Sequence, residues 1–492
     1  MSFAKVYTRG LLGLHAPQIE VEVHISSGLP SLTIVGLAEA AVRESKDRVR
    51  SAIINSGFLF PTKRLTINLA PADLPKDGSR LDLPIALGIL IASGQLPENC
   101  TEGFELIGEL ALDGHLRPVS GILPIAMACQ HAQHRLLVPT ANLEEANQLP
   151  NFEVYGAQHL QEVCAHFLGS SQIKASPKRE NTASSYYQFD LADVKGQLRP
   201  RRALEIAAAG GHSLLFKGPP GTGKTLLASR LPSILPPLNA QENLEVASIY
   251  SVANAQHTFG QRPFRAPHHT ASAIALVGGG SQPKPGEITL AHLGVLFLDE
   301  LPEFDRKVLE VLRQPLESKE IVISRAARQM TFPANFQFIA AMNPCPCGYA
   351  FNRDSRCQCS PESIQRYQNR ISGPLLDRID LHIDVPPLQA KELQDHTVTE
   401  NSEIVRQRVI SAYEKQIQRQ QCLNQALSPK LLEKHALLDQ DSVKIIEMAQ
   451  QRLNLSARAY HRVLRVARTI ADLAESDPIL SSHLTEALSY RG

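Results

Sequence analysis

The sequence predicts an α/β protein with a parallel sheet at its centre, an α+β domain before it and a helical domain after it. Two continuous apolar runs, at 213–216 and 294–298, are typical of parallel strands that helices cover on both faces. The first run leads through a glycine-rich loop into a helical segment, the order expected in a layered α/β sheet. From about residue 391 onward, apolar residues recur at helical spacing.

The N-terminal part alternates strand-like and helical patterns. Residues 19–25 and 64–69 alternate apolar and polar side chains, whereas 40–54 and 83–93 have helical patterns. A polar stretch of small residues then separates this part from the α/β core and predicts a flexible linker. The predicted boundaries are 1–168 for the N-terminal domain, 169–188 for the linker, 189–390 for the α/β core and 391–492 for a helical lid.

The composition and net charge limit where in the cell the protein can be located and which partners it can bind. With 50 basic and 49 acidic residues the net charge is +1, so any nucleic-acid surface must be local. No apolar run is long enough to span a bilayer, and the N-terminus has no signal-peptide core. We therefore expect a cytoplasmic protein without a membrane partner. The scattered cysteines fit reduced thiols in that compartment.

The most specific motif is an octapeptide that fits GxxxxGK[ST], the phosphate-binding P-loop, at every fixed position. Its glycines let backbone N–H groups surround phosphate oxygens, and the following helix N-terminus adds partial positive charge. Lys224 is expected to reach the β- and γ-phosphates of ATP, and the Thr225 hydroxyl to ligate Mg²⁺. The residues expected to bind the nucleotide are Gly218, Pro219, Pro220, Gly221, Thr222, Gly223, Lys224 and Thr225.

Two acidic residues, Asp299 and Glu300, follow the second apolar run. Ligands of open α/β sheets bind at the carboxyl ends of the strands, so this pair is predicted to lie beside the P-loop. Asp299 is expected to complete the Mg²⁺ shell, and Glu300 to orient or deprotonate the attacking water. The alternative for such a pair is a surface turn without a catalytic task.

Four cysteines cluster in the loop 345–359, at Cys345, Cys347, Cys357 and Cys359. Four thiolates close in sequence, with glycine and proline to turn the chain, predict a tetrahedral structural Zn²⁺ site. The CxC spacing differs from the commoner CxxC pairs. Free thiols, labile disulfides and an iron–sulfur cluster are the alternatives.

Further motifs resemble those of one ATPase family. Residues 193–197 are similar to a stretch that runs over the adenine, and 262–291 to an insertion before the acid-bearing strand. Residues 189–492 thus resemble AAA+ ATPases of the helix-2-insert clade, and nearly the whole chain resembles the ComM/YifB family of magnesium chelatase-like proteins. Within the insertion, His268 and His269 suit a turn or a phosphate contact better than a metal site, because adjacent side chains point different ways.

The resemblance implies two roles beside the phosphates. Asn343 ends the apolar run that begins at Phe338, and would be the sensor 1 residue that reaches the γ-phosphate or its water. Arg378 would be an arginine finger that enters the ATP site of a neighbouring subunit. The alternative for Arg378 is an ion pair with Asp377 or Asp380 at a helix end.

The resemblance also implies roles for three arginines further from the P-loop. Arg458 would be the sensor 2 residue, with Arg462 one turn later on the same face as the second choice. Arg325 and Arg328 would lie near the tip of a hairpin that faces the central channel of a ring, where they could track DNA phosphates. Two solvated surface arginines are the alternative.

Residues 75–78 and 108–121 resemble the Lon-type protease fold, which uses a Ser–Lys dyad. The serine position falls on Arg80 and the lysine position on Leu123, so the dyad is absent. Without the lysine, nothing lowers the pKa of a nearby hydroxyl such as that of Ser79. The resemblance therefore implies that the N-terminal domain is a Lon-like shell, which means a domain with the protease fold but without its dyad. This domain would contact DNA or other subunits.

Together these features predict an ATP- and Mg²⁺-dependent hexameric motor. The resemblance implies that it acts on single-stranded and branched DNA, as a branch-migration helicase of natural transformation. The alternatives are a chelatase-type remodelling ATPase that drives magnesium insertion, and a non-enzymatic regulator gated by ATP.

Overall fold

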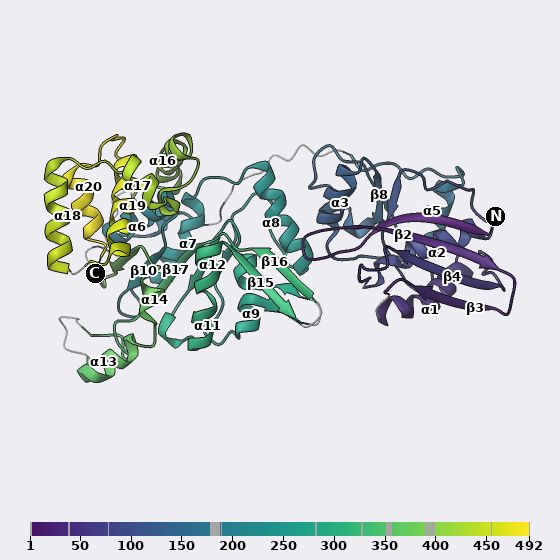
Figure 1. Ribbon diagram of the computed structural model, residues 1–492, viewed down its shortest axis with the longest axis horizontal. Coiled ribbons are helices and arrows are strands. Elements are labelled where there is room, and N and C mark those ends of the chain that lie inside the picture. Colours follow the sequence, from purple (N-terminus) through teal and green to yellow (C-terminus); the bar gives the residue numbers. More distant parts are fainter. Residues whose placement is uncertain are drawn as a thin grey trace. The chain divides into compact units, whose positions relative to one another are not determined.

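The chain folds into two compact units. The computed structural model describes residues 2–37, 40–76, 78–177, 187, 189–280, 283–325, 328–350, 357–388, 392, 399–453 and 455–491. One unit contains 1–183 with 243–259, and the other contains 184–242 with 260–492 (Figure 1). Much of the predicted linker lies outside the described residues. In its first part, the Ser176 amide donates to the carbonyl oxygen of Val154 at 2.8 Å, which ties that part to the first unit.

The first unit is built on a seven-stranded mixed sheet in the order β3-β4-β2-β1-β5-β8-β9. Period-two alternation buries every second residue of β2 and β4, as the sequence predicts. The strands are β1 (Phe3–Arg9), β2 (Gln18–Ser26), β3 (Ser31–Val35), β4 (Arg64–Ala70), β5 (Phe104–Leu106), β8 (Arg135–Pro139) and β9 (Val154–Ala157), with a small ladder of β6 (Glu109–Leu110) and β7 (Leu116–Arg117). The helices are α1 (Ala40–Asn55), α2 (Asp82–Ala92), α3 (Ile122–His131), α4 (Leu143–Ala146) and α5 (Leu160–Phe167).

A segment from the middle of the chain completes the first unit. Within α8 (Ala240–Ala253), Ala247 is buried in the same cluster as Leu123 of α3. The first amides of a helix lack partners within the helix. At α3 they are met from α8, because the Gly121 amide donates to the carbonyl oxygen of Ser251 at 3.1 Å and the Leu123 amide to Ser251 Oγ at 3.3 Å. Residues 243–259 therefore belong to the N-terminal unit, although they follow the P-loop in sequence.

The second unit contains a five-stranded sheet in the order β11-β14-β17-β10-β18, and every neighbouring pair is parallel. The two apolar runs of the sequence are β10 and β14, which confirms the predicted parallel sheet. All four residues of β14 are buried. The strands are β10 (Leu214–Lys217), β11 (Phe264–Arg265), β14 (Val295–Leu298), β17 (Gln337–Met342) and β18 (Leu381–Asp384).

Helices accompany this sheet and form the C-terminal region. Those within the α/β part are α6 (Leu198–Gly210), α7 (Lys224–Ile234), α9 (Ala273–Val277), α10 (Glu287–Leu290), α11 (Arg306–Val311), α12 (Arg313–Ser318), α13 (Pro361–Gln368) and α14 (Gly373–Leu376). Two small ladders are β12 (Gly278–Gly279) with β13 (Lys284–Pro285), and β15 (Glu320–Arg325) with β16 (Arg328–Pro333).

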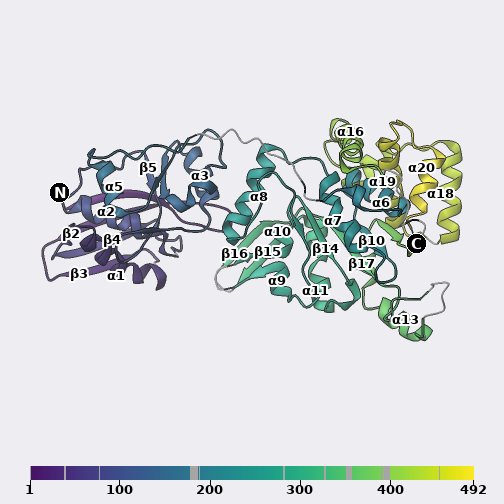
Figure 2. The ribbon, with the colours of Figure 1, turned by 180° about the vertical axis from the view of Figure 1, so that it is seen from behind.

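The C-terminal region is helical, as predicted, and shares its core with the sheet. Its helices are α16 (Ser402–Gln420), α17 (Pro429–His435), α18 (Gln440–Leu453), α19 (Ala457–Leu473) and α20 (Ser481–Leu488). Both α16 and α19 pack against α6 (Figure 2). One apolar cluster runs from Phe216 of β10 to Ile470 of α19. None of the helices in the described ranges is long and apolar enough to cross a membrane.

Candidate active site

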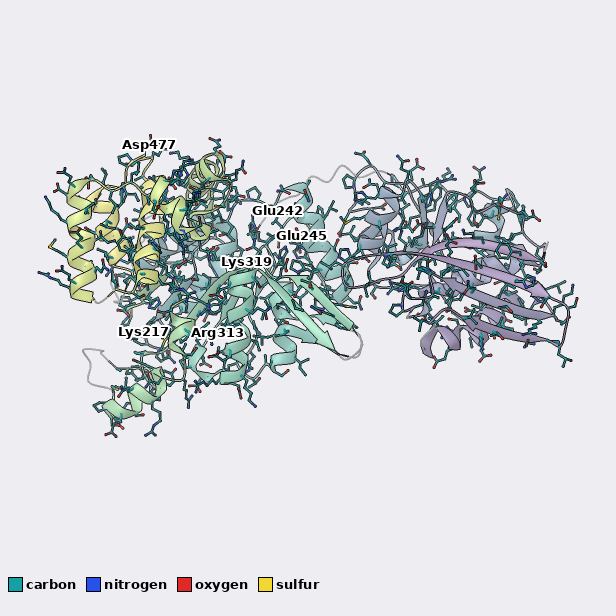
Figure 3. The ribbon with its side chains drawn as sticks, viewed as in Figure 1. Lys217, Glu242, Glu245, Arg313, Lys319 and Asp477 are labelled. Atoms are coloured by element: carbon teal, nitrogen blue, oxygen red, sulfur yellow. The ribbon has the colours of Figure 1, made fainter. Side chains whose placement is uncertain are left out.

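The P-loop follows β10 at the carboxyl edge of the parallel sheet. Figure 3 labels Lys217, the last residue of β10. The loop requires glycine at three positions for two reasons. A Cβ on Gly218 would lie 2.3 Å from the carbonyl oxygen of Val385, whereas Gly221 and Gly223 have φ +75° and +85°. Because β14 and β17 run parallel to β10, the residues that follow all three strands converge at this edge.

Lys224 contacts the P-loop and the end of β17. Its Nζ donates to the carbonyl oxygens of Gly218 and Pro219 at 2.8 Å each, and to Asn343 Oδ1 at 3.1 Å. Lys224 is 8% exposed, and burial lowers its pKa. The structure thus brings the P-loop lysine and the predicted sensor 1 residue together. Charged phosphate oxygens are stronger acceptors for this ammonium group than the two carbonyls.

Thr225 and Asp299 form the next contact along the same edge. Thr225 Oγ1 donates to Asp299 Oδ2 at 2.5 Å, and Asp299 Oδ1 accepts from the Glu300 amide at 2.9 Å. A hydroxyl beside a carboxylate is an oxygen donor set that Mg²⁺ prefers. Thr225 is exposed and Asp299 is partly exposed, so a hydrated ion can reach them. These two residues fit the magnesium site that the sequence predicts.

Glu300 has a partner that sequence reasoning missed. Its backbone is left-handed, with φ +53°, and its Oε2 lies 3.1 Å from His269 Nδ1. The ring of His268 packs against that of His269, with centroids 4.1 Å apart, and shares a 2.9 Å hydrogen bond with Thr270 Oγ1. The strand order could have indicated the contact, because His269 follows β11 and β11 lies beside β14 in the sheet.

A cavity of about 770 Å³ is lined by the segment that resembles an adenine-binding stretch. Gln197 connects it to the P-loop, since its Nε2 donates to the carbonyl oxygens of Pro386 at 2.8 Å and Thr222 at 3.5 Å. Those two acceptors fix which end of the amide is the nitrogen. Among the described residues, none donates to the buried Oε1 of Gln197. A buried acceptor without a donor is costly, and the 6-amino group of an adenine is a donor.

Arg378 and Arg458 lie at the opposite edge of the sheet. Arg378 precedes β18, and its carbonyl oxygen accepts from Ser213 Oγ just before β10, at 2.8 Å. Its guanidinium donates to Glu317 Oε1, in place of the Asp377 or Asp380 pair considered above, and to the carbonyl oxygen of Pro374. Arg458 Nη2 donates to the same Glu317 oxygen at 2.9 Å. Glu317, which sequence reasoning missed, therefore binds both predicted arginines at the edge of the sheet opposite the P-loop.

A small basic cavity surrounds this pair. It measures about 140 Å³, and its charged lining residues are Glu317, Lys319, Arg378, Asp380, Arg458, Arg462 and Arg465. Figure 3 labels Lys319, which lies between α12 and β15. Arg462, the second choice for sensor 2, is buried, and its Nε lies 3.7 Å from Asp380 Oδ1. Burial lowers the pKa of Arg462 to about 10.

The two arginines predicted to contact DNA face each other across a hairpin. Arg325 ends β15, Arg328 begins β16, and the two are partners in the antiparallel register. Their side chains lie outside the described part of the structure. The hairpin itself is as the sequence resemblance predicts.

The four cysteines of the predicted zinc site converge. Their sulfur atoms all lie within 4.8 Å of one another. Cys345 Sγ is 3.3 Å from Cys347 Sγ and 3.8 Å from Cys357 Sγ, and Cys347 Sγ is 3.6 Å from Cys357 Sγ. Tetrahedral zinc with Zn–S bonds of about 2.3 Å separates its sulfurs by about 3.8 Å. The cluster therefore fits a zinc ion, and all four cysteines are free of disulfides.

The protonation of the cluster also favours a bound cation. A backbone hydrogen bond from Tyr349 lowers the pKa of Cys347 to about 6, so that one thiolate forms at neutral pH. The backbone of Cys359 lowers the pKa of Cys357, but burial and the neighbouring Cys347 outweigh it and raise that pKa to about 12. A second thiolate is thus opposed until a cation shares its charge.

The first unit lacks a protease dyad at the positions that resemble Lon. Leu123 is fully buried in α3, and the Ser79 hydroxyl donates to the carboxylate of Glu109. Lys76 is buried, burial lowers its pKa, and its Nζ donates to the carbonyl oxygen of Pro71. Lys76 therefore hydrogen-bonds to a backbone carbonyl oxygen and not to Ser79.

Comparison with known proteins identifies the family. The model for magnesium chelatase subunit ChlI matches residues 190–393, that for subunit ChlI of Mg-chelatase matches 21–142, and that for the ChlI C-terminal region matches 399–491. The protein YifB of Salmonella typhimurium is 52% identical over all of this chain and 97% of its own length. Competence protein ComM of Haemophilus influenzae is 50% identical over all of this chain and 98% of its own length. The chain belongs to the ChlI-like family of ComM and YifB.

Membership of the ComM/YifB family confirms the resemblance drawn from the motifs. The ChlI-like matches span both the N-terminal sheet and the parallel sheet with its helical region. A more distant likeness concerns Lon protease 2 of Bacillus subtilis, which is 24% identical over 176 residues and 32% of this chain.

Proposed function

We propose that this chain is a Mg²⁺-dependent ATPase that works as a hexameric ring motor on single-stranded and branched DNA. The proposed task is branch migration during homologous recombination in natural transformation, carried out in the cytoplasm. Kinship with a protein named for competence supports the biological setting. Arg325 and Arg328 are the proposed DNA contacts, because they are register partners at the end of a hairpin and arginine binds phosphates.

The observation that carries the proposal is the division of the candidate site between two edges of one sheet. Lys224, Thr225 and Asp299 lie at the carboxyl edge, whereas Arg378 lies just before β18 at the amino edge. A strand of four residues spans about 13 Å. An arginine finger on the far edge can reach an ATP only if that ATP belongs to another subunit, so hydrolysis requires a ring or filament.

The roles in hydrolysis follow from these placements. Lys224 and Asn343 bind the terminal phosphates, Glu300 positions the attacking water, and Arg378 with Arg458 neutralises charge on the phosphoryl group of the neighbouring subunit. Magnesium, held by Thr225 and Asp299, would offset phosphate charge when bound. When a nucleotide binds, its phosphates would replace the Gly218 and Pro219 carbonyls as acceptors for Lys224.

Two inactive variants test the shared site. Lys224→Ala removes the phosphate cation and Arg378→Ala removes the finger, so each alone is expected to lose ATP hydrolysis and junction unwinding. Mixed in equal amounts, they form some interfaces with one intact Lys224 and one intact Arg378. We expect the mixture to recover part of the hydrolysis. A mixture as inactive as its components, with mixed rings present, contradicts the proposal.

A chelatase-type remodelling ATPase is the second candidate, because all three matching family models describe magnesium chelatase subunits. The discriminating measurement is ATP turnover with and without branched DNA. Stimulation by DNA favours the motor. An ATP-gated regulator is excluded if Glu300→Gln abolishes function while nucleotide binding persists.

For the first unit we propose a Lon-like shell that contacts DNA or other subunits and does not cleave peptides. The buried Leu123 and the Ser79–Glu109 hydrogen bond support it. Release of peptides from casein by the wild-type protein, lost in Ser79→Ala, would overturn it. For the cysteine cluster we propose Zn²⁺, whose tetrahedral spacing matches the sulfur separations.

A further inference from the structure

The cysteine cluster lies directly against the P-loop. A Cβ built on Gly348 would be 2.6 Å from Cδ and 3.1 Å from Cγ of Pro220, so the Gly348 backbone touches the proline ring. Pro220 is the third residue of the P-loop. Gly348 directly follows Cys347 and its amide donates to the carbonyl oxygen of Cys345 at 3.0 Å. The turn 345–348, which carries the first two cysteines, therefore contacts the P-loop.

The same cluster also fixes the end of β17. Cys345 is fully buried two residues after Asn343, and its Sγ accepts from the Ala350 amide at 3.2 Å. Between them, the carbonyl oxygen of Pro344 accepts from Gln368 Nε2 at 3.0 Å. Asn343, which contacts Lys224, therefore lies only two residues before Cys345, the first cysteine of the cluster.

From this placement we infer that the metal bound by the four cysteines supports the ATP site, so that its occupancy sets nucleotide affinity. The inference rests on the proposed ATPase function. Bound metal holds Gly348 against Pro220 and Asn343 beside Lys224. When the metal leaves, no ligand bonds hold the four sulfurs together, so the turn loosens and Gly348 no longer supports Pro220 of the P-loop. Metal binding and local folding are coupled in sites of this kind.

Metal removal tests the inference on the full-length protein. Zinc is stripped with a zinc-selective chelator that leaves Mg²⁺ in place, and the Kd of a fluorescent ADP analogue is measured by anisotropy. We expect Kd to rise at least tenfold after zinc is removed. It should return to the value of the untreated protein when Zn²⁺ alone is added. Cys357→Ser is expected to reproduce the loss, and Cys422→Ser, outside the cluster, to leave Kd unchanged. An unchanged Kd in the zinc-free protein overturns the inference.

A second variant tests the contact without touching the metal. Gly348→Ala pushes a methyl group into Pro220, so we expect weaker ADP binding with full zinc content. Gly94→Ala is the matched control, because Gly94 has φ +76° against φ +85° at Gly348 but nothing within 4 Å of its added Cβ. It carries the same backbone strain without the clash. Equal Kd values for the two glycine variants overturn the inference even if the cysteine variants misfold.

Failure of the inference can be told from failure of the proposed function. Lys224→Ala abolishes ADP binding if the P-loop is the nucleotide site. If Lys224→Ala binds as the wild type does, the proposed ATPase function fails. If Lys224→Ala loses binding while zinc removal and Gly348→Ala do not weaken it, only the role of the metal fails.

Discussion

Arg378 and Arg458 donate to one and the same oxygen atom, Oε1 of Glu317. Arg378 follows α14 and Arg458 lies at the start of α19, and no sequence motif relates either of them to Glu317. Glu317 has a side chain that is 53% exposed, so a triphosphate arriving on another subunit can compete for both guanidinium groups. The carboxylate thus occupies the place that the proposed function gives to phosphate.

We predict that Glu317→Gln makes the shared site easier to form. Without the negative charge, the two arginines are freer to meet phosphate, so KM for ATP in the DNA-stimulated reaction should fall severalfold. Arg378→Ala should instead reduce the turnover rate by about 10³-fold or more. Glu310→Gln is the control, since Glu310 pairs with Arg313. A rise in KM for Glu317→Gln would show that Glu317 orients the arginines rather than occupying them.

His269 is predicted to position the residue that activates water. His269→Ala frees the Glu300 carboxylate, and a displacement of about 1 Å can cost about 100-fold in rate. We expect the turnover rate to fall by about 10- to 100-fold while ADP affinity stays the same. His268→Ala, which removes the bond to Thr270 and the ring contact with His269 but leaves the His269–Glu300 pair, should lose much less activity. Equal rates for the two variants contradict this role.

Gln197 is predicted to recognise the base. Its unpaired Oε1 can accept from the 6-amino group of adenine, whereas inosine presents an acceptor at that position. We expect the wild-type protein to prefer ATP over ITP and Gln197→Leu to lose that preference. The measurement is the ratio of kcat/KM for the two nucleotides. A ratio that Gln197→Leu leaves unaltered would exclude the contact.

Two half-buried histidines predict a loss of stability in acid. Burial lowers the pKa of His382 in β18 to about 4, whereas in the unfolded chain this pKa is about 6.5. Between these two pH values the unfolded chain binds a proton at His382 and the folded chain does not. Stability therefore falls as pH drops from about 6.5 to about 4, by up to about 3 kcal/mol. His382→Gln should flatten this slope in urea unfolding followed by probes in the second unit.

His257 provides the matched comparison in the other unit. Burial lowers its pKa to about 4 as well, and it belongs to the segment that completes the first unit. His257→Gln should flatten the acid slope of the first unit and leave that of the second. Slopes that do not change with either variant would mean that other groups dominate acid unfolding.

The sequence was sufficient for the sheet and its carboxyl edge because those features depend on local patterns. The apolar runs at β10 and β14 need burial on two faces, and a P-loop must follow its strand directly. From these rules the sequence predicted that Lys224, Thr225 and Asp299 lie close together. The contact of Lys224 with Asn343 follows from the same logic, once β17 is placed between β10 and β14.

What the sequence could not predict are contacts that depend on tertiary packing alone. In the sequence, Glu317 resembles any surface glutamate at the end of a helix. Its role depends on two arginines that contact it only in the folded chain. The contact of Gly348 with Pro220 likewise joins loops that no motif relates. Neither has a spacing or a period that could have been read in advance.

The insertion of residues 243–259 into the N-terminal unit has a consequence for how this protein could arise or be divided. A fragment that stops before Ser184 lacks Ala247 beside Leu123 and leaves the start of α3 without Ser251. Such a fragment should be recovered only as aggregates, or rescued by a synthetic peptide of that segment. No single contiguous stretch of the gene therefore encodes the N-terminal unit, and a transfer of that unit to another protein would carry the P-loop between its two segments with it.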